Sequence, residues 1–212
     1  MLHVLKKYGL DSQQLKDISI KTYPFGKTIL HEGDICDVLI IVVSGKAKVG
    51  KTAPNGKDLI LCFYVEDGMI GDMELFSKTN IVSSSVTVID ELTCIVIPVE
   101  ENKDYLMNSL EFVRIAANEM SRKLYTSAES VVENTLYTAE IRLCRYILSA
   151  QVKGTFRDIM KDVAYSVGIS YRHLYRMMGK LCKEGILEKK ESGYKILDLE
   201  GLKKKSEVAT NI

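Results

Sequence analysis

The sequence predicts an α+β chain in three parts, which are an antiparallel β-domain, a long helix and a winged helix-turn-helix. Short β-rich runs separated by glycine turns occupy residues 27–97. Apolar residues then recur about every 3.5 positions through residues 111–134. A helix–glycine–helix pattern over residues 160–186 is followed at once by two strand-like runs. We therefore place the three parts at residues 1–107, 108–137 and 138–212.

The composition is that of a soluble globular protein, with 46% hydrophobic and 27% charged residues. No run approaches the roughly 20 apolar residues that span a bilayer, and residues 1–11 lack the apolar core of a signal peptide. A cytoplasmic protein with no membrane partner is expected. The five cysteines are widely spread without a CxxC pair, which argues against a disulfide framework and against a zinc site. Three scattered histidines and no nucleophile motif predict that the chain is not an enzyme.

Charge is divided unevenly along the chain. Residues 1–137 hold 14 Lys/Arg against 19 Asp/Glu, whereas residues 138–212 hold 15 against 9. This distribution is expected if only the C-terminal part touches nucleic acid.

The first part reads as one or two short helices over residues 1–22, followed by strands. The strand-like runs are rich in Val, Ile, Thr, Phe or Tyr, and they cover residues 28–30, 38–43, 47–49, 59–64, 83–89 and 93–97. Asn55-Gly56 is a strong hairpin signature between two of them. Strands at this spacing without intervening helices indicate an antiparallel barrel or sandwich of about seven or eight strands.

The second part is a helix whose seam follows a heptad pattern. At about 1.5 Å per residue it is about 36 Å long, so it is expected to pair with a copy of itself rather than pack alone on the β-domain. Polar residues in the seam set its register or meet a ligand. The seam comprises Val113, Ala117, Met120, Leu124, Ser127, Val131 and Asn134.

The third part opens with an amphipathic helix over residues 138–151 and continues as a helix-turn-helix. Gly168 ends one helix, and Ser170 is a good N-cap for the next. The second helix buries Leu174, Met177, Met178 and Leu181, which leaves its basic and aromatic residues on the surface. Such a face suits a recognition helix in the major groove, although an ordinary helical hairpin is the alternative.

Two strand-like runs, residues 186–190 and 193–197, form a hairpin directly after this helix. A hairpin at this place is a wing, and its lysines Lys189, Lys190 and Lys195 lie where a wing meets phosphates. The tail after Leu199 is expected to be partly disordered.

This order of parts resembles the Crp/Fnr family of bacterial transcription regulators over nearly the whole chain. Residues 29–34, 44–47, 55–57 and 67–72 look like the family's β-roll turns, and residues 71–76 are similar to the start of its cyclic-nucleotide phosphate cassette. Residues 167–172 match its DNA-reading motif. Within the family, residues 169–174 look most like the YeiL-type subgroup.

The resemblance implies a homodimeric regulator that binds a palindromic promoter site in double-stranded DNA and works with RNA polymerase. Residues 1–107 become a cyclic-nucleotide-binding-like β-roll (jelly roll) that senses a small effector. Residues 108–137 become the dimerisation helix, and residues 138–212 the DNA-binding winged helix-turn-helix. Base contacts are implied for Tyr171, Arg172 and Arg176. The full implied DNA-binding set is Ser170, Tyr171, Arg172, His173, Arg176, Lys180, Lys189 and Lys190.

The implied effector pocket departs from the cyclic-AMP-binding pattern. Asp72 stands where the family has a ribose-binding glutamate, and Val82 stands where it has a phosphate-binding arginine. Only Lys78 is expected to supply positive charge nearby, so the residues argue against cyclic AMP and no cofactor is assigned. Asp72 and Glu74 could equally be turn and helix-start residues. The implied pocket set is Gly71, Asp72, Met73, Glu74, Val82, Ser83, Ser84 and Ser127.

Two alternatives remain. A redox-responsive regulator would use cysteine thiols, yet Cys62 and Cys94 fall in core strands, and the acidic neighbours of Cys36 disfavour a thiolate. A cyclic-nucleotide-binding signalling module would explain the β-roll but not the basic winged helix.

Overall fold

The computed structural model describes residues 2–52 and 59–207, and it describes side chains over residues 3–52, 64–129 and 136–207. The chain divides into two units. The first comprises Met1–Lys51 and Cys62–Ser127, and the second comprises Thr52–Leu61 and Ala128–Ile212. The boundary falls within the long helix α4, Leu110–Leu136.

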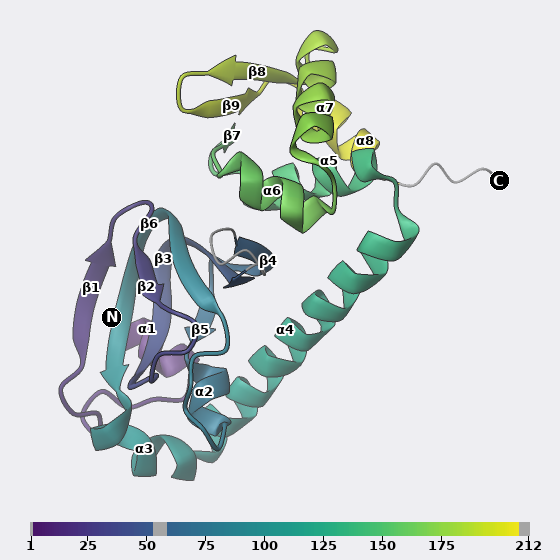
Figure 1. Cartoon of the computed structure of the whole chain (residues 1–212). Coiled ribbons are helices and arrows are strands. Elements are labelled where there is room, and N and C mark those ends of the chain that lie inside the picture. Colours follow the sequence, from purple (N-terminus) through teal and green to yellow (C-terminus); the bar gives the residue numbers. More distant parts are fainter. Residues whose placement is uncertain (1, 53–58, 208–212) are drawn as a thin grey trace. The chain divides into compact units, whose positions relative to one another are not determined.

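Two long antiparallel strands organise the first unit. β3 (Val38–Thr52) and β6 (Ser85–Pro98) pair from Val38 opposite Pro98 to Gly50 opposite Ser85 and run side by side in Figure 1. β1 (Ser19–Tyr23) and β2 (Thr28–Leu30) pair with β6, whereas β4 (Leu59–Val65) and β5 (Gly68–Ile70) pair with β3. The result is the predicted antiparallel β-roll.

Successive side chains of a strand point to opposite sides, and in β3 both sets of side chains are buried. Leu39 and Ile41 join a core that also holds residues of α1 (Leu2–Lys7), α3 (Val99–Asn108) and α4. Ile40 and Val42 face the other way, into a core formed with apolar residues of β6. The short helix α2 (Asp72–Phe76) follows β5 and contributes Leu75 to the first core.

The second unit contains α5 (Ala139–Ala150), α6 (Met160–Val167), α7 (Tyr171–Lys183) and α8 (Leu199–Ser206). A three-stranded sheet accompanies them, in the order β7 (Thr155–Phe156), β9 (Gly193–Ile196), β8 (Leu187–Lys190). Figure 1 shows β8 and β9 as a hairpin directly after α7. The predicted winged helix-turn-helix is therefore confirmed as a fold.

The turn between α6 and α7 forms as its residue types predict. Gly168 adopts a left-handed conformation with φ 69°, and Ile169 N–H donates to the carbonyl of Ala164 at 3.0 Å. Ser170 caps α7, because its hydroxyl accepts from the backbone N–H of His173 at 3.2 Å. The predicted buried stripe of α7 is confirmed at Leu174, Met177, Met178 and Leu181.

Several sequence-based boundaries were wrong. The N-terminal helices end early, and Ser19–Tyr23 is a strand on β6. The two runs expected over residues 38–49 form one strand, because register shifts around Ser44 absorb Gly45 as an irregularity instead of a turn. The same holds for the runs expected within residues 83–97, which merge in β6.

Two helices were not predicted. α3 follows Pro98, and α8 occupies most of the described part of the tail, which was expected to be partly disordered. α8 forms because Asp198 caps it, accepting from Gly201 N–H at 2.8 Å, and because Leu202 is fully buried. The Asn55-Gly56 hairpin lies outside the described residues. None of the helices in the described part of the chain has the length and apolar character needed to cross a membrane.

Candidate functional site

A cavity of about 290 Å³ lies in the first unit, lined by residues from the β-roll, α2 and α4. Its volume is at the small end of ligand-binding pockets. Most of its wall is apolar, formed by Leu30, Val49, Val65, Met69, Ile70, Met73, Val86, Met120 and Leu124. The polar lining residues are Lys51, Asp72, Glu74, Ser83, Ser84, Lys123 and Ser127.

The cavity collects the predicted pocket residues except Val82, because Gly71, Asp72, Met73, Glu74, Ser83, Ser84 and Ser127 all line it. Val82 is buried but does not line the cavity. Its N–H donates to the carbonyl of Asp34 at 2.8 Å, and its own carbonyl accepts from Gly33 at 2.9 Å. Val82 therefore joins two segments of the roll and is not part of the wall.

Gly71 positions the acidic residues of α2. It adopts φ 86°, and a Cβ at this position would lie 2.5 Å from the carbonyl oxygen of Val38. Only glycine permits both the left-handed turn and this close approach. The turn leads directly into α2, whose first residues, Asp72 and Glu74, are buried at 1% and 8% exposure.

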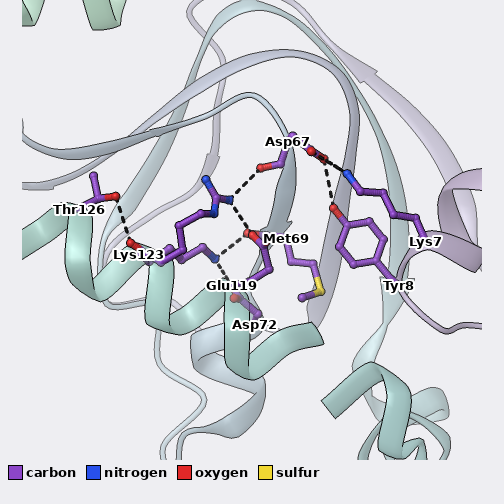
Figure 2. Close-up of polar contacts among 9 residues, drawn as sticks. Lys7, Tyr8, Asp67, Met69, Asp72, Glu119, Lys123 and Thr126 are labelled. Atoms are coloured by element: carbon purple, nitrogen blue, oxygen red, sulfur yellow. Dashed lines mark hydrogen bonds and ion pairs between the residues drawn. The ribbon is translucent and has the colours of Figure 1, made fainter. Parts of the chain in front are cut away.

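Asp72 forms a buried ion pair with Lys123 of α4, shown in Figure 2. The Lys123 Nζ lies 2.5 Å from Asp72 Oδ1 and also donates to the carbonyl of Met69 at 2.8 Å. Burial raises the pKa of the Asp72 carboxyl, and the ammonium of Lys123 opposes that rise. The second oxygen, Oδ2, is buried without a hydrogen-bond partner among the described residues.

Lys123 was missed by the sequence analysis, which assigned α4 to self-pairing. It follows Phe112, Ala116 and Glu119 at spacings of four, three and four, so it shares their face. Phe112 and Ala116 are fully buried, and Lys123 is buried too. A lysine that continues an apolar stripe next to the heptad seam was the pattern that could have identified it.

Glu74 of α2 also lines the cavity and is held by Ser83. Its Oε1 accepts from both the backbone N–H and the hydroxyl of Ser83, at 3.0 and 2.8 Å. These two bonds join α2 to the segment that precedes β6. Ser83 therefore lines the cavity and also donates both of its hydrogen bonds to Glu74.

The expectation that only Lys78 supplies positive charge near the pocket was wrong. Lys51 and Lys123 line the cavity, whereas Lys78 does not. Both lining lysines face carboxylates, since Lys51 lies 3.6 Å from Glu32 and Lys123 lies 2.5 Å from Asp72. Sequence reasoning missed them because they come from β3 and α4, far from the cassette residues in the chain.

The predicted seam of α4 is only partly exposed. Val113 and Met120 are half-buried, whereas Ala117, Leu124 and Ser127 are exposed, with Leu124 at 71%. Met120, Leu124 and Ser127 also line the cavity. Val131 and Asn134 lie outside the residues whose side chains are described.

In the second unit, α7 presents a basic and aromatic face. Arg172 and Arg176 are exposed and make no ion pair among the described residues. Tyr171 and Tyr175 form a T-shaped pair with ring centroids 4.7 Å apart and hydroxyl oxygens 3.0 Å apart. His173 is half-buried.

The predicted lysines differ in their partners. Lys180 lies 2.9 Å from Glu140 of α5, so its ammonium is held by the protein's own carboxylate. Lys190 pairs with Glu188 across 2.7 Å, whereas Lys189 is exposed and has no ion pair within the described part of the chain. Lys195, the remaining wing lysine, is likewise exposed and makes no ion pair among the described residues.

The three buried cysteines of the described residues do not resemble reactive thiols. Burial raises the pKa of Cys36 to about 11, that of Cys94 to about 12 and that of Cys144 to about 11. The Sγ of Cys36 also donates to the carbonyl of Val38 at 3.3 Å. The side chain of Cys62 lies outside the described residues. No group of His, Cys, Asp and Glu in the described ranges could hold a metal ion.

Comparison with known proteins relates both units to one family. The model of the cyclic nucleotide-binding domain matches residues 20–109, and that of the Crp-like helix-turn-helix domain matches residues 141–205. The chain is 28% identical to the regulatory protein YeiL of Escherichia coli O157:H7 over 168 residues, which cover 79% of this chain and 76% of that protein.

Two further proteins are similar over more of the chain. A CRP-like cAMP-activated global transcriptional regulator of Mycobacterium tuberculosis is 22% identical over 201 residues, covering 90% of this chain and 89% of that protein. The crystal structure of a transcriptional regulator of the Crp/Fnr family from Eubacterium rectale has a TM-score of 0.77 at 17% identity. It covers 95% of this chain and 97% of that one. The latter likeness shows the fold.

Proposed function

The chain belongs to the Crp/Fnr family of transcription regulators, and on that premise we propose that it binds a palindromic site in double-stranded DNA as a homodimer. In this proposal α7 reads base edges, the β8–β9 wing contacts phosphates, and α4 pairs with its copy. A small effector in the β-roll cavity sets the affinity for DNA. RNA polymerase is the proposed partner at the promoter.

The exposed face of α7 is the observation that supports DNA reading. Arg172 and Arg176 are one helical turn apart and are exposed without ion pairs among the described residues. An arginine donates two hydrogen bonds to guanine, which is the commonest specific contact in the major groove. Tyr171 is beside them and is fixed by its contact with Tyr175, so it loses little side-chain freedom on binding.

A homodimer is supported by apolar side chains on α4 that the first unit leaves exposed. Leu124 is 71% exposed, and Ala117 lies on the same seam. Pairing of two such helices gives a protein with two recognition helices. Such a dimer is expected to select an inverted repeat with half-sites about 34 Å apart, one turn of DNA.

The test begins with selection of bound sequences from random DNA by the purified full-length protein. Arg172→Ala and Arg176→Ala are then compared on the selected site and on random DNA by fluorescence anisotropy. We expect each change to remove roughly 1–3 kcal/mol of binding free energy at the selected site, and little on random DNA. Arg157→Ala, an exposed arginine outside α7, is the control and should leave the discrimination intact.

Lys189→Ala should behave differently, because phosphate contacts carry no sequence information. It should weaken binding to all sequences about equally and reduce the salt slope by about 1. Failure to enrich any inverted repeat would contradict the proposal. If both arginine variants weaken binding to the selected site and to random DNA equally, these arginines contact phosphates and not bases.

A cyclic-nucleotide response is the second candidate, because the cyclic nucleotide-binding domain model matches and a relative is described as cAMP-activated. Against it, both lining lysines face carboxylates, so a cyclic phosphate would need to break an ion pair to gain a charged partner. Calorimetric titration of the protein with cyclic AMP and cyclic GMP separates the two candidates. Micromolar binding of either, with tighter DNA binding, would establish the nucleotide response.

A further inference from the structure

We infer that the cavity takes a small amphipathic cation, a ligand with an apolar body and a protonated nitrogen, rather than an anion. The inference rests on the proposed function only in treating the cavity as an effector site. Three features of the cavity carry it, namely its apolar wall, its charge balance and an unused buried acceptor.

The wall requires an apolar body. Three methionines, Met69, Met73 and Met120, line the cavity together with leucine, isoleucine and valine side chains. Methionine adapts its shape to the group it contacts, so such a wall fits ligands of irregular outline. A ligand that is charged over most of its surface would lose hydration here without replacement.

The charge balance favours a positive ligand. Lys123 is balanced by Asp72, and Lys51 at 58% side-chain exposure is balanced by Glu32. Glu74 lines the same cavity at 8% exposure, and within the described residues no cation lies within ion-pair distance of it. One buried carboxylate therefore has hydrogen bonds from Ser83 but no opposite charge. A ligand cation supplies that charge, whereas an anion does not.

One buried polar atom of the cavity wall has no partner among the described residues, and it is an acceptor. Asp72 Oδ2 is buried and has no hydrogen-bond partner in the described part of the structure. A buried acceptor without a partner costs free energy that a donor recovers. A protonated amine has several N–H donors and no acceptor, so it matches both Asp72 and Glu74. A carboxylate or phosphate offers only acceptors and matches neither.

Three probes of similar size test this class on the full-length protein by isothermal titration calorimetry at neutral pH. They are phenethylamine, 2-phenylethanol and phenylacetate, which share an aromatic body and carry a positive, a neutral and a negative head group. We expect the amine to bind at least about tenfold more tightly than the alcohol, because hydrogen bonds to charged groups are the stronger ones. Phenylacetate should bind more weakly than the alcohol.

The variant Glu74→Gln removes the uncompensated charge and keeps an oxygen that accepts from Ser83. It should lower the affinity for phenethylamine about tenfold and leave 2-phenylethanol unchanged. The matched control is Glu100→Gln, an exposed carboxylate of α3 that does not line the cavity, and it should change none of the three affinities. Far-UV circular dichroism and thermal unfolding verify that the variants are folded.

Three outcomes would overturn the inference. These are tighter binding of phenylacetate or cyclic AMP than of the amine, an unchanged amine affinity in Glu74→Gln, and no binding of any of the three probes at millimolar concentration. DNA selection without any probe tests the proposed function separately. If the amine binds but leaves affinity for the selected site unchanged, the ligand class stands and the effector role in the proposed function fails.

Discussion

At the scale of single residues, substitution of either Lys123 or Asp72 alone is expected to destabilise the protein strongly. Both side chains are almost completely buried, and the pair joins α4 to the start of α2. A buried ion pair gains little over apolar residues of the same shape, but the loss of one partner leaves an uncompensated buried charge. The effect of each substitution therefore depends on what remains beside it.

Lys123→Met is expected to lower the free energy of unfolding by about 3–5 kcal/mol at neutral pH, because Asp72 loses its ion-pair partner. The double variant with Asp72→Asn should recover much of that loss. Urea denaturation at equilibrium measures both.

Arg122→Met is the matched control, since the adjacent Arg122 has an exposed guanidinium that pairs with Glu119 at 2.7 Å. This control should cost less than about 1 kcal/mol. Equal costs for Lys123→Met and Arg122→Met would contradict the burial argument.

Gly71 and Gly26 form a second matched pair. Both have positive φ, 86° and 81°, but a Cβ on Gly71 meets the Val38 carbonyl oxygen at 2.5 Å, whereas a Cβ on Gly26 meets nothing within 4 Å. Gly26→Ala should cost about 1–2 kcal/mol of stability from backbone strain alone. Gly71→Ala should cost at least about 1 kcal/mol more, because the backbone must shift. Thermal unfolding of the two variants side by side measures the difference, and equal costs would argue against the close approach.

At the scale of elements, an ion network holds the C-terminal end of α7. Glu140 of α5 lies 2.9 Å from Lys180 of α7 and 3.2 Å from Lys205 of α8. Glu184 at the end of α7 lies 3.1 Å from Lys205. The network joins three helices that are separate in the sequence, and it holds the ammonium of Lys180 against the carboxylate of Glu140.

The network predicts a pH dependence. The hydrogen bond from Lys180 holds the pKa of Glu140 below its usual value of 4.5, and Lys205 adds to the effect. A carboxylate with a lowered folded-state pKa stabilises the fold above its unfolded-state pKa, and that stabilisation is lost as the pH falls through the lowered value. Glu140→Gln should therefore cost less than about 1 kcal/mol at pH 7 and nothing at strongly acidic pH.

Urea denaturation across this pH range, compared with Glu200→Gln, measures the effect. Glu200 pairs only within α8, with Lys203 at 2.8 Å among the described residues, so its substitution should matter less. A cost for Glu140→Gln that persists at strongly acidic pH would show that the network is not its source.

At the scale of the whole molecule, one helix serves two predicted purposes. Met120, Leu124 and Ser127 line the cavity and also belong to the seam of α4. A ligand in the cavity therefore contacts side chains that are predicted to meet the partner subunit. Occupancy of the cavity and pairing of α4 are expected to influence each other for this reason.

Leu124→Asp should give monomers, because a charge in an apolar seam must be desolvated on pairing. Sedimentation velocity at micromolar concentration measures the association. Tyr125→Asp is the control, since Tyr125 is 73% exposed, lies next to Leu124 and is outside the seam. If the Leu124→Asp variant still sediments as a dimer, the dimer interface does not lie on the seam of α4.

The sequence by itself determined the elements whose causes are local. Gly168 and Ser170 end one helix and begin the next through their own backbone and side-chain bonds. The heptad pattern predicted α4, and the strand-like runs predicted an antiparallel roll. The order of these parts was sufficient to identify the Crp/Fnr family before any contact was known. The family resemblance implied that Gly71, Asp72, Glu74 and Ser83 lie together, and all four line the cavity.

Only the tertiary structure decided which charges meet. In the sequence, Lys123 is one of several polar residues of a long helix. In the structure its ammonium pairs with Asp72, which is 51 residues away in the chain. Lys51 of β3 lines the cavity, and Lys180 forms an ion pair with Glu140. Leu202 of α8 is fully buried. Local patterns reflect backbone preference and amphipathicity, whereas ion pairing and burial depend on which distant elements come within a few ångströms of one another.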